Sequence, residues 1–497
     1  MIRLNVNLLN RKVTIAERMR VFQPYIEYID QFGFNETLIP KLIADHKSIK
    51  QDVHLLQKRY EVSTDGVPIL TRSPVPLDLE NDKVRRIDAL VNNKVNTAFD
   101  ADIVDTKVGY MYGIPVNYTV EGVRDEPRLQ PLATEIDNFR VRNAVADKDA
   151  SLGKQTDIAG YGARLAYVAL ENNKPVLRIM NVDTDEVIFL FEETIAEPKY
   201  SMRYYDTFVL DQQANKQNVT KVEFYDANTI WYFDNLNGTF ELTGYQEHGF
   251  MYNPLFGMEN NDEMQGAAMR IMNLIDAYDR ALSDASSEVE SMRLALLILH
   301  NIGLQPEEIQ QMQKSGALEI WGPDAKVSFL TKNVNDSMIE HLLERLEKNI
   351  MRIGKSVDFT CEEFASNLSG IAILMKTMAL EHKAGTTEQK NRTTLQYQFK
   401  VLCSGWARLG YCQPEDYLKV WFEFKRNLPK NLLEAAQTSQ ALKGYVSEDT
   451  RLSLLPFVDD VAAERLAMEE DSKIYGSNLG PLNEDDDDDD PKEVDDS

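Results

Sequence analysis

Two stretches with helical spacing of apolar residues, on either side of a stretch without it, constrain the fold of this chain most. They occupy 263–285 and 336–357, and within each of them apolar residues recur at intervals of three and four. This spacing predicts two amphipathic helices. Between them, 286–335 is predicted to form a compact insertion with short strands near 318–321 and 327–330. The apolar faces consist of Met264, Ala268, Ile271, Ile275, Tyr278 and Leu282 in the first helix and of Ile339, Leu342, Leu346, Ile350, Ile353 and Val357 in the second.

A loop and a long helix are predicted after the second amphipathic helix. Residues 358–370 have the composition of a loop, whereas 371–410 contain no proline and are rich in helix formers. At about 1.5 Å per residue, an unbroken helix of this length would extend about 60 Å, and Gly385 is the position where we expect a kink.

The C-terminal region, 411–475, is predicted to fold into short helices. Gly444 is expected to end one helix, Ser447 to cap the next, and Pro456 to precede the last. Within 476–497, the final stretch from Glu484 holds ten acidic residues and one lysine. A run of one charge sign does not bury a core, so we expect an acidic disordered tail.

The first part of the chain, 1–262, mixes helical and strand patterns, so the predicted fold class is α+β. Apolar residues at helical intervals predict a helix at 85–105 (Ile87, Leu90, Val91, Val95, Phe99 and Ile103). The other expected elements are a turn-rich stretch at 109–115, a strand at 116–120, a helix or strand at 161–170, strands in 175–191, and paired strands at 221–231 and 239–247 joined by a turn at Asn237 and Gly238.

The net charge of −26 limits how this chain can bind nucleic acid. The tail contributes −9 of this charge, so the body is acidic even without it. Proteins that grip nucleic acid usually present a basic surface, because neutralising the phosphates drives binding. Any contact with DNA is therefore expected to be local, weak or repulsive.

Neither a membrane segment nor a disulfide framework is expected. The longest apolar runs, 165–170 and 294–299, are far shorter than the roughly 18 residues of a membrane span, and 1–12 lack the apolar core of a signal peptide. We therefore expect a protein that is made and used in a cytoplasm-like compartment. Three scattered cysteines, Cys361, Cys403 and Cys412, are expected to be reduced and structural.

No motif for catalysis is complete, so we expect no enzyme, catalytic residue, cofactor or metal. The best phosphate-loop candidate, at Gly153 and Lys154, lacks the Ser or Thr that must follow the lysine. The six histidines have no metal-ligand spacing. Two acidic pairs leave a magnesium-dependent nuclease open as an alternative: Asp100 with Asp102, and Asp183 with Asp185.

Basic residues form a stripe on the second amphipathic helix. They are spaced three, four and three apart and lie about 140° from the apolar face. An acidic strip (Glu340, Glu344 and Glu347) lies between the two. Three separate faces suit a ring of repeated subunits, but they also suit a solvated helix with intrahelical ion pairs. The basic residues of the stripe are Arg345, Lys348, Arg352 and Lys355.

Four blocks, in order along the chain, resemble the portal proteins of long-tailed bacteriophages, especially those that infect Gram-positive bacteria. The blocks are Asn92-Asn93-Lys94 with Ile103 to Tyr110, Gly113 and Pro115; Asn260-Asn261 with Leu274 to Asp279 and Leu282-Ser283; Ser369-Gly370-Ile371-Ala372; and Val446 to Thr450 with Leu454-Leu455-Pro456. Each block alone is weak, but together they span nearly the whole chain.

The resemblance implies a ring of twelve subunits, or thirteen when isolated, at one vertex of the capsid of the virion. It implies a channel for packaging and ejecting double-stranded DNA, with assembly in the host cytoplasm and no membrane. The implied partners are the terminase large subunit, a head-completion adaptor, the scaffold and the major capsid protein. The implied parts are a wing (1–262 and the long, kinked helix 371–410), a two-helix stem, a small α/β clip (286–335), a tunnel loop (358–370) and a helical crown (411–475).

We expect weak DNA contacts from the basic stripe and from Lys332 at the end of the clip. In the tunnel loop, Glu362, Glu363, Phe364 and Asn367 are expected to line the channel. The two glutamates favour a steric, repulsive collar over a grip on DNA. Besides the nuclease, an acidic monomeric interaction protein that binds through its tail remains an alternative.

Overall fold

In the computed structural model, the described residues are 14–73, 91–210, 216–235, 238–293, 297–300, 326–329, 336–359, 370–428, 432–455, 458 and 461–475. Helices and sheets are both present, which confirms the α+β class. The chain divides into two compact units, Met1–Phe359 with Thr377–Asn427, and Thr360–Lys376 with Leu428–Ser497. No helix within the described residues is long and apolar enough to span a membrane.

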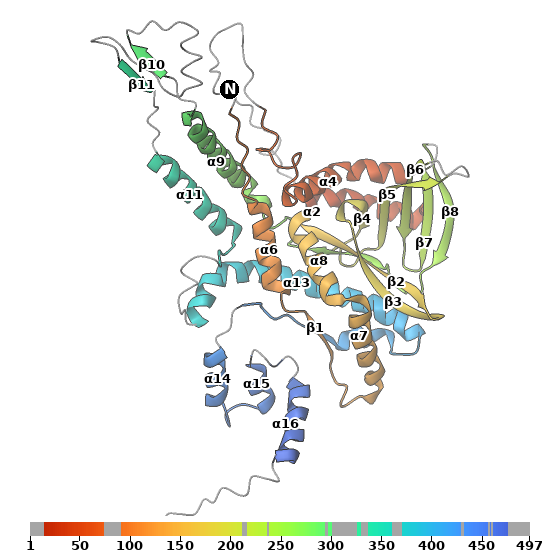
Figure 1. Ribbon diagram of the computed structural model, residues 1–497. Helices are drawn as coiled ribbons and strands as arrows, with labels where there is room; N and C mark the ends of the chain where they lie inside the picture. The colour runs from red at the N-terminus through yellow and green to blue at the C-terminus, as the bar shows by residue number, and fades with distance from the viewer. Residues whose placement is uncertain are drawn as a thin grey trace, which may run out of the picture. The chain divides into compact units, whose positions relative to one another are not determined.

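An antiparallel five-stranded sheet and the N-terminal helices form the main core of the first unit (Figure 1). Buried and part-exposed residues alternate along β6, as Val222 and Phe224 do with Lys221 and Glu223, which gives the sheet one apolar face. The helices pack on that face, and Phe34 stacks on Phe224 with ring centroids 3.7 Å apart. The helices are α2 (Ile15–Met19), α3 (Gln23–Phe32) and α4 (Ile39–Tyr60), and the strands, in sheet order, are β4 (Val187–Leu190), β5 (Tyr200–Leu210), β6 (Lys216–Tyr225), β7 (Thr229–Asn235) and β8 (Phe240–Glu247).

The strand predicted at 221–231 is wrong, because β6 ends and β7 begins within it. Asp226 makes the turn: its carboxylate accepts hydrogen bonds from the backbone N–H groups of Asn228 and Thr229, both at 2.7 Å. Such an Asx turn competes with the strand ladder. The predicted pairing of the second strand, 239–247, is confirmed as β7 with β8. Asn237 lies outside the described residues.

A second sheet, of three antiparallel strands, has β2 (Tyr161–Glu171) at its centre, between β3 (Lys174–Val182) and β9 (Leu255–Glu259). The segment 161–170, for which the sequence leaves helix or strand open, is therefore a strand. Helices α7 (Gln130–Asn143) and α8 (Val145–Ala159) precede this sheet and pack against it. Gly160, with φ of +92°, ends α8 where the backbone of Met264 leaves no room for a side chain.

The helix predicted at 85–105 begins later than expected. Helix α6 is Phe99–Tyr112, and it continues through the first part of the predicted turn at 109–115. Residues 91–98 form an irregular strap, because their polar side chains and backbone bond to a neighbouring helix (below); part of the predicted helix, 85–90, lies outside the described residues. The strand predicted next is confirmed as β1 (Asn117–Val120).

The two amphipathic helices are α9 (Met272–Arg293) and α11 (Asp336–Gly354), and they pack together. Helix α9 begins and ends later than the predicted 263–285. A helix cannot start at 264 because the chain there crosses α8 closely: a Cβ at Gly266 would meet the carbonyl oxygen of Ile158 at 2.3 Å. Between the helices, β10 (Leu297–His300) pairs with β11 (Lys326–Phe329), which confirms a strand near 327–330. The other strand, expected at 318–321, lies outside the described residues.

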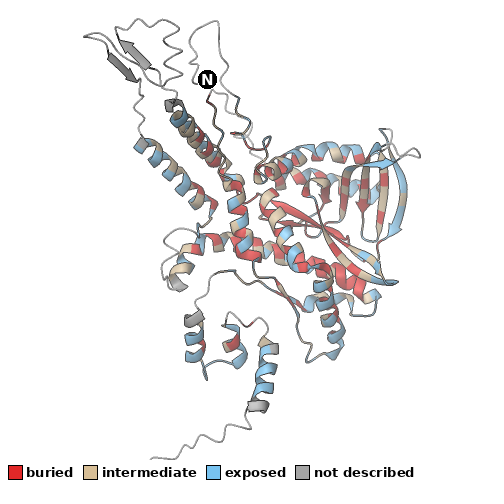
Figure 2. Ribbon diagram, in the orientation of Figure 1, coloured by how far each residue is buried: buried red, intermediate tan, exposed pale blue. Residues whose placement is uncertain are grey.

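The long helix is confirmed as α13 (Gly370–Arg408), which is helical through Gly385. After it, β12 (Val420–Glu423) pairs with β1, so the prediction of helices throughout 411–475 is wrong at that point. Three short helices follow, and Ser447 caps the second as predicted. Pro456 and the tail 476–497 lie outside the described residues. The helices are α14 (Leu432–Ala441), α15 (Glu448–Ser453) and α16 (Val461–Tyr475), the last of which is largely exposed (Figure 2).

Candidate functional site

A buried apolar core and two buried ion clusters surround the start of α9 and the end of α11, here called the base of the α9–α11 pair. Ile271 and Ile275 from the first predicted apolar face and Ile350 from the second meet in one core with Ile103 of α6. The second face is not buried throughout, however, because Leu342 is 45% exposed and Ile353 is 48% exposed. Helix α11 therefore has an apolar side that the described part of the chain leaves largely exposed.

Arg59, at the end of α4, joins α6 and α9 through a buried ion cluster. Its guanidinium donates to both carboxylate oxygens of Asp100, at 3.2 and 2.9 Å, and lies 2.9 Å from the carboxylate of Asp276. Only 4% of the Arg59 side chain is exposed. Burial raises the pKa of Asp100 and of Asp276, although the guanidinium opposes this. The cluster ties α9 to the body by charge as well as by packing.

The strap 91–98 lies along α9 and is held by hydrogen bonds to side chains of that helix. The Asp279 carboxylate accepts from the backbone N–H of Thr97 (3.1 Å), the hydroxyl of Thr97 (2.6 Å) and the amide of Asn96 (2.6 Å). One turn further along, the Ser283 hydroxyl accepts from the N–H of Val95 (2.9 Å). The strap and α9 therefore satisfy each other's polar groups without forming regular structure.

A second buried charge, Lys107 of α6, joins four segments of the chain. Its ammonium donates to the carboxylate of Asp157 at the end of α8, to the side-chain oxygen of Asn260 (2.8 Å) and to the hydroxyl of Thr387 in α13 (2.6 Å). The side chains of Lys107 and Asp157 are both 0% exposed. The three N–H donors of the ammonium thus have three acceptors, as a buried charge requires.

The basic stripe lies on solvent-exposed positions of α11 and just beyond it. Arg345, Lys348 and Arg352 belong to the helix, and Lys355 follows its last residue with φ of +52°. Lys348 forms an intrahelical pair with Glu344 at 2.7 Å, as the solvated-helix alternative predicts. Lys332, Glu362, Glu363, Phe364 and Asn367 lie outside the described residues.

The acidic pairs do not form a metal centre in the part of the chain that the structure describes. Asp100 is bound by Arg59, and Asp185 lies 3.6 Å from Lys50. Among the described residues, no three or more His, Cys, Asp or Glu side chains come together in a way that suits a metal ion.

The structure also describes the phosphate-loop candidate and two of the three cysteines. Gly153 is inside α8 and packs on the Tyr112 ring, so it is not part of a loop. Cys403 and Cys412 are free thiols, and Cys361 lies outside the described residues.

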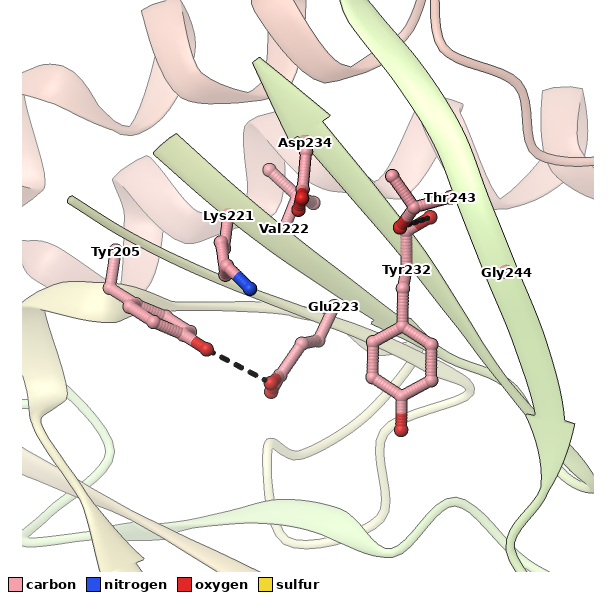
Figure 3. Close-up of a pocket in the computed structure, with 8 residues that line it drawn as sticks. All are labelled: Tyr205, Lys221, Val222, Glu223, Tyr232, Asp234, Thr243 and Gly244. Carbon is pink, nitrogen blue, oxygen red and sulfur yellow. Dashed lines mark hydrogen bonds between the residues drawn. The ribbon is translucent and has the colours of Figure 1, made fainter. Parts of the chain in front are cut away.

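The outer face of the five-stranded sheet carries a shallow polar hollow of about 250 Å³ that the sequence analysis missed (Figure 3). In Figure 3 the Tyr205 hydroxyl points to the Glu223 carboxylate, to which it donates at 3.4 Å. Lys221 and Asp234 also line the hollow. Polar residues do alternate along β6 in the sequence. Any strand with one face in solvent shows this alternation, so it does not indicate a hollow.

Comparison with known proteins shows one family over most of the chain. The family described as "Phage portal protein, SPP1 Gp6-like" matches residues 39–475. A portal protein of Clostridium phage phiCD119 is 23% identical over 466 residues, which cover 89% of this chain and 97% of that protein. The portal protein of Bacillus phage SPP1 is 23% identical over 432 residues, which cover 82% of each chain.

Proposed function

Because this chain belongs to the SPP1 Gp6-like family of phage portal proteins, we propose that twelve copies form a ring at one capsid vertex, whose channel passes double-stranded DNA during packaging and ejection. Phage portal proteins are virion components that form an oligomeric ring in the capsid. The family match therefore confirms the predicted family and, at this level of detail, the predicted role. The observation that carries the proposal is a match that runs from 39 to 475 and so includes both amphipathic helices and the long helix.

A phage in which this gene is inactivated tests the role directly. The expected particles are capsids without DNA, and a plasmid copy of the gene should restore DNA-filled, infectious particles. Normal yields of filled capsids in the absence of the protein would overturn the proposal. The nuclease alternative predicts instead that the purified protein cleaves DNA when magnesium is added, whereas we expect neither cleavage nor ATP hydrolysis.

Within this role, Arg345, Lys348, Arg352 and Lys355, with Lys332, are proposed to make weak contacts with the DNA phosphates. The support is that Arg345, Lys348 and Arg352 are exposed on α11 and Lys355 just after it, in a chain that is otherwise acidic. Lys332 lies outside the described residues. Weak contacts favour passage because a deep energy well would stall the DNA, and phosphate contacts weaken as salt rises. Changing the four residues of the stripe to glutamate should reduce packaging and its salt dependence, whereas the exposed Lys41 and Lys47 of α4 serve as controls. If packaging is unchanged, the stripe has a structural role and the proposed DNA contacts are wrong.

The loop 358–370 is proposed to be a repulsive collar around the DNA, lined by Glu362, Glu363, Phe364 and Asn367. Two glutamates repeated around a ring would keep a polyanion away from the wall. Changing both glutamates to glutamine should alter DNA passage and the retention of packaged DNA. If shortening the loop and neutralising its glutamates both leave passage and retention as in the wild type, the collar is absent.

Docking is assigned by family resemblance. We propose that 286–335 bind the terminase large subunit and the head-completion adaptor, and that the ring assembles with scaffold and major capsid protein in the host cytoplasm. A pull-down with a variant that lacks 301–325 should lose terminase and adaptor but keep the oligomer. Retention of both partners would place docking elsewhere.

A further inference from the structure

Lys383 of α13 reaches from the long helix to the bases of both α9 and α11. Its ammonium nitrogen donates to the carbonyl oxygen of Gly354 at 2.6 Å and to that of Ala267 at 3.1 Å. Gly354 is the last residue of α11, and Ala267 lies in the segment that leads into α9. One side chain therefore contacts the last residue of α11 and the segment that precedes α9.

The contact with Gly354 has a physical reason. The last carbonyls of a helix lack intrahelical partners and carry partial negative charge, so an amino group is a favourable partner for them. The end of α11 is also tightly packed, since a Cβ at Gly354 would meet Ile271 at 3.0 Å. Directly after Gly354 the chain turns through Lys355 towards the segment 358–370. The position of this turn is thus set by packing and by Lys383.

The charges around Lys383 are unbalanced. Lys107 from α6, Arg270 before α9 and Lys355 after α11 are basic neighbours, whereas Asp157 from α8 is acidic and is bound by Lys107. Burial, with a further contribution from Lys107, lowers the pKa of Lys383 to about 7. Lys383 also borders a hollow of about 320 Å³, which Asp262 and Glu263 from the segment after β9 line as well. The hollow leaves room for a larger side chain at this position.

We propose that Lys383 is a positioning residue that fixes the end of α11, and with it the turn into 358–370, to the long helix, and that this tie strengthens as the pH rises from about 7 to 9. A neutral amine has two N–H donors, which match the two carbonyl acceptors. The tie is a property of this chain's fold; its effect on DNA passage rests on the proposed function.

The sign of the pH effect follows from proton linkage. When the tie opens, Lys383 becomes hydrated and its pKa returns towards the usual 10.5 of lysine. Between pH 7 and that value, the open state therefore binds a proton that the closed state does not. Raising the pH in this window disfavours opening, by at most about tenfold per pH unit. Below pH 7 both states are protonated and the dependence disappears.

Hydrogen exchange of the full-length protein, followed by mass spectrometry, tests the tie on peptides that cover 350–358. After correction for intrinsic exchange, wild-type protection should be flat from pH 6 to 7 and rise about tenfold or more from 7 to 9. Lys383→Met should lose at least about tenfold protection at pH 9 and show no rise. Lys383→Arg keeps donors that are always charged, so at every pH its protection should stay near that of the wild type at pH 6 to 7, without the rise.

Lys400→Met is the matched control, because Lys400 lies on the same helix and pairs with Glu197, which does not line the hollow beside Lys383. It should leave exchange in 350–358 as in the wild type. Wild-type exchange in Lys383→Met, or a wild-type profile that is flat from pH 7 to 9, would overturn the proposal. If Lys383→Met does not fold, the proposal is tested by the pH dependence of exchange in the wild type and in Lys383→Arg. The rise with pH and its loss in Lys383→Met report on a contact within one chain, so failure of the tie is distinguishable from failure of the proposed function.

Discussion

Arg59 and Lys107 place two positive charges inside the protein. Arg59 binds two carboxylates and Lys107 binds one, all from other helices. Removing charges from water is costly, so such groups persist only where partners and hydrogen bonds compensate. Here the partners connect α4, α6, α8, α9 and α13 around the base of the paired helices. We infer that these residues give the base a single defined arrangement, whereas packing alone would permit several.

Replacing Arg59 with methionine should destabilise the first unit by about 3–5 kcal/mol, because it leaves Asp100 and Asp276 buried without a counter-charge. The loss should be smaller at pH 5 than at pH 8. A carboxyl whose pKa is raised in the folded protein binds a proton that the unfolded chain releases, so acid favours the folded state of the variant. Chemical denaturation at both pH values measures this.

The control is Arg465→Met, which breaks an exposed pair with Asp449 and should leave stability unchanged. If Arg59→Met loses the same free energy of unfolding at pH 5 and at pH 8, the buried carboxylates are not the cause of its destabilisation.

None of these buried residues could be identified from the sequence. Lys107 and Thr387 lie 280 positions apart, and neither belongs to a motif for binding or catalysis. A lysine inside a helix is usually exposed, so neither the burial of Lys107 nor the partial burial of Lys383 could be predicted. By contrast, Ser447 was predicted correctly as a helix cap, because a cap depends only on neighbours in sequence.

At the scale of elements, the strap 91–98 shows how periodicity can mislead. Val91, Val95 and Phe99 have helical spacing, but the strap also contains three Asn and one Thr, whose side chains offer the backbone other partners. The bonds to Asp279 and Ser283 of α9 decide the outcome, and they are absent from any local window. The long helix α13 was predicted well because its length and composition are sufficient by themselves.

Replacing Asp279 with alanine should release the strap without unfolding α9. Its carboxylate accepts three hydrogen bonds from Asn96 and Thr97, so we expect exchange of the backbone amides in 92–98 to accelerate by about tenfold or more. Hydrogen exchange mass spectrometry measures this, with Arg280→Ala on the exposed side of α9 as the control. Unchanged exchange in 92–98 would mean that the strap is held by other contacts.

The uncovered apolar side of α11 is the element that should respond to assembly. Leu342 and Ile353 are nearly half exposed in the single chain, and a neighbouring subunit in a ring would cover such a face. Replacing Leu342 with glutamate should therefore give a folded monomer or an open oligomer. Size-exclusion chromatography with light scattering measures the mass, and circular dichroism checks the fold.

Val141→Glu is the matched control, since Val141 is 85% exposed on α7 and lies apart from this face. It should assemble as the wild type does. Closed rings from Leu342→Glu would show that the α11 face is not between subunits.

At the scale of the whole molecule, composition and order of elements were more informative than any single residue. The α+β class, the long helix and the helical pair around a strand-containing insertion were all predicted. The pairing of β1 with β12 was not, because it joins segments some three hundred residues apart and each strand has only four residues. The acidic body fits a conduit that must not hold DNA tightly.

The central claim is that this chain assembles into a closed ring, and the mass of the native protein tests it most directly. Native mass spectrometry or light scattering, paired with negative-stain images, should give a particle of about twelve or thirteen subunits of 56.8 kDa with a central hole. A stable 56.8 kDa monomer at every concentration, without rings in the images, would contradict the account.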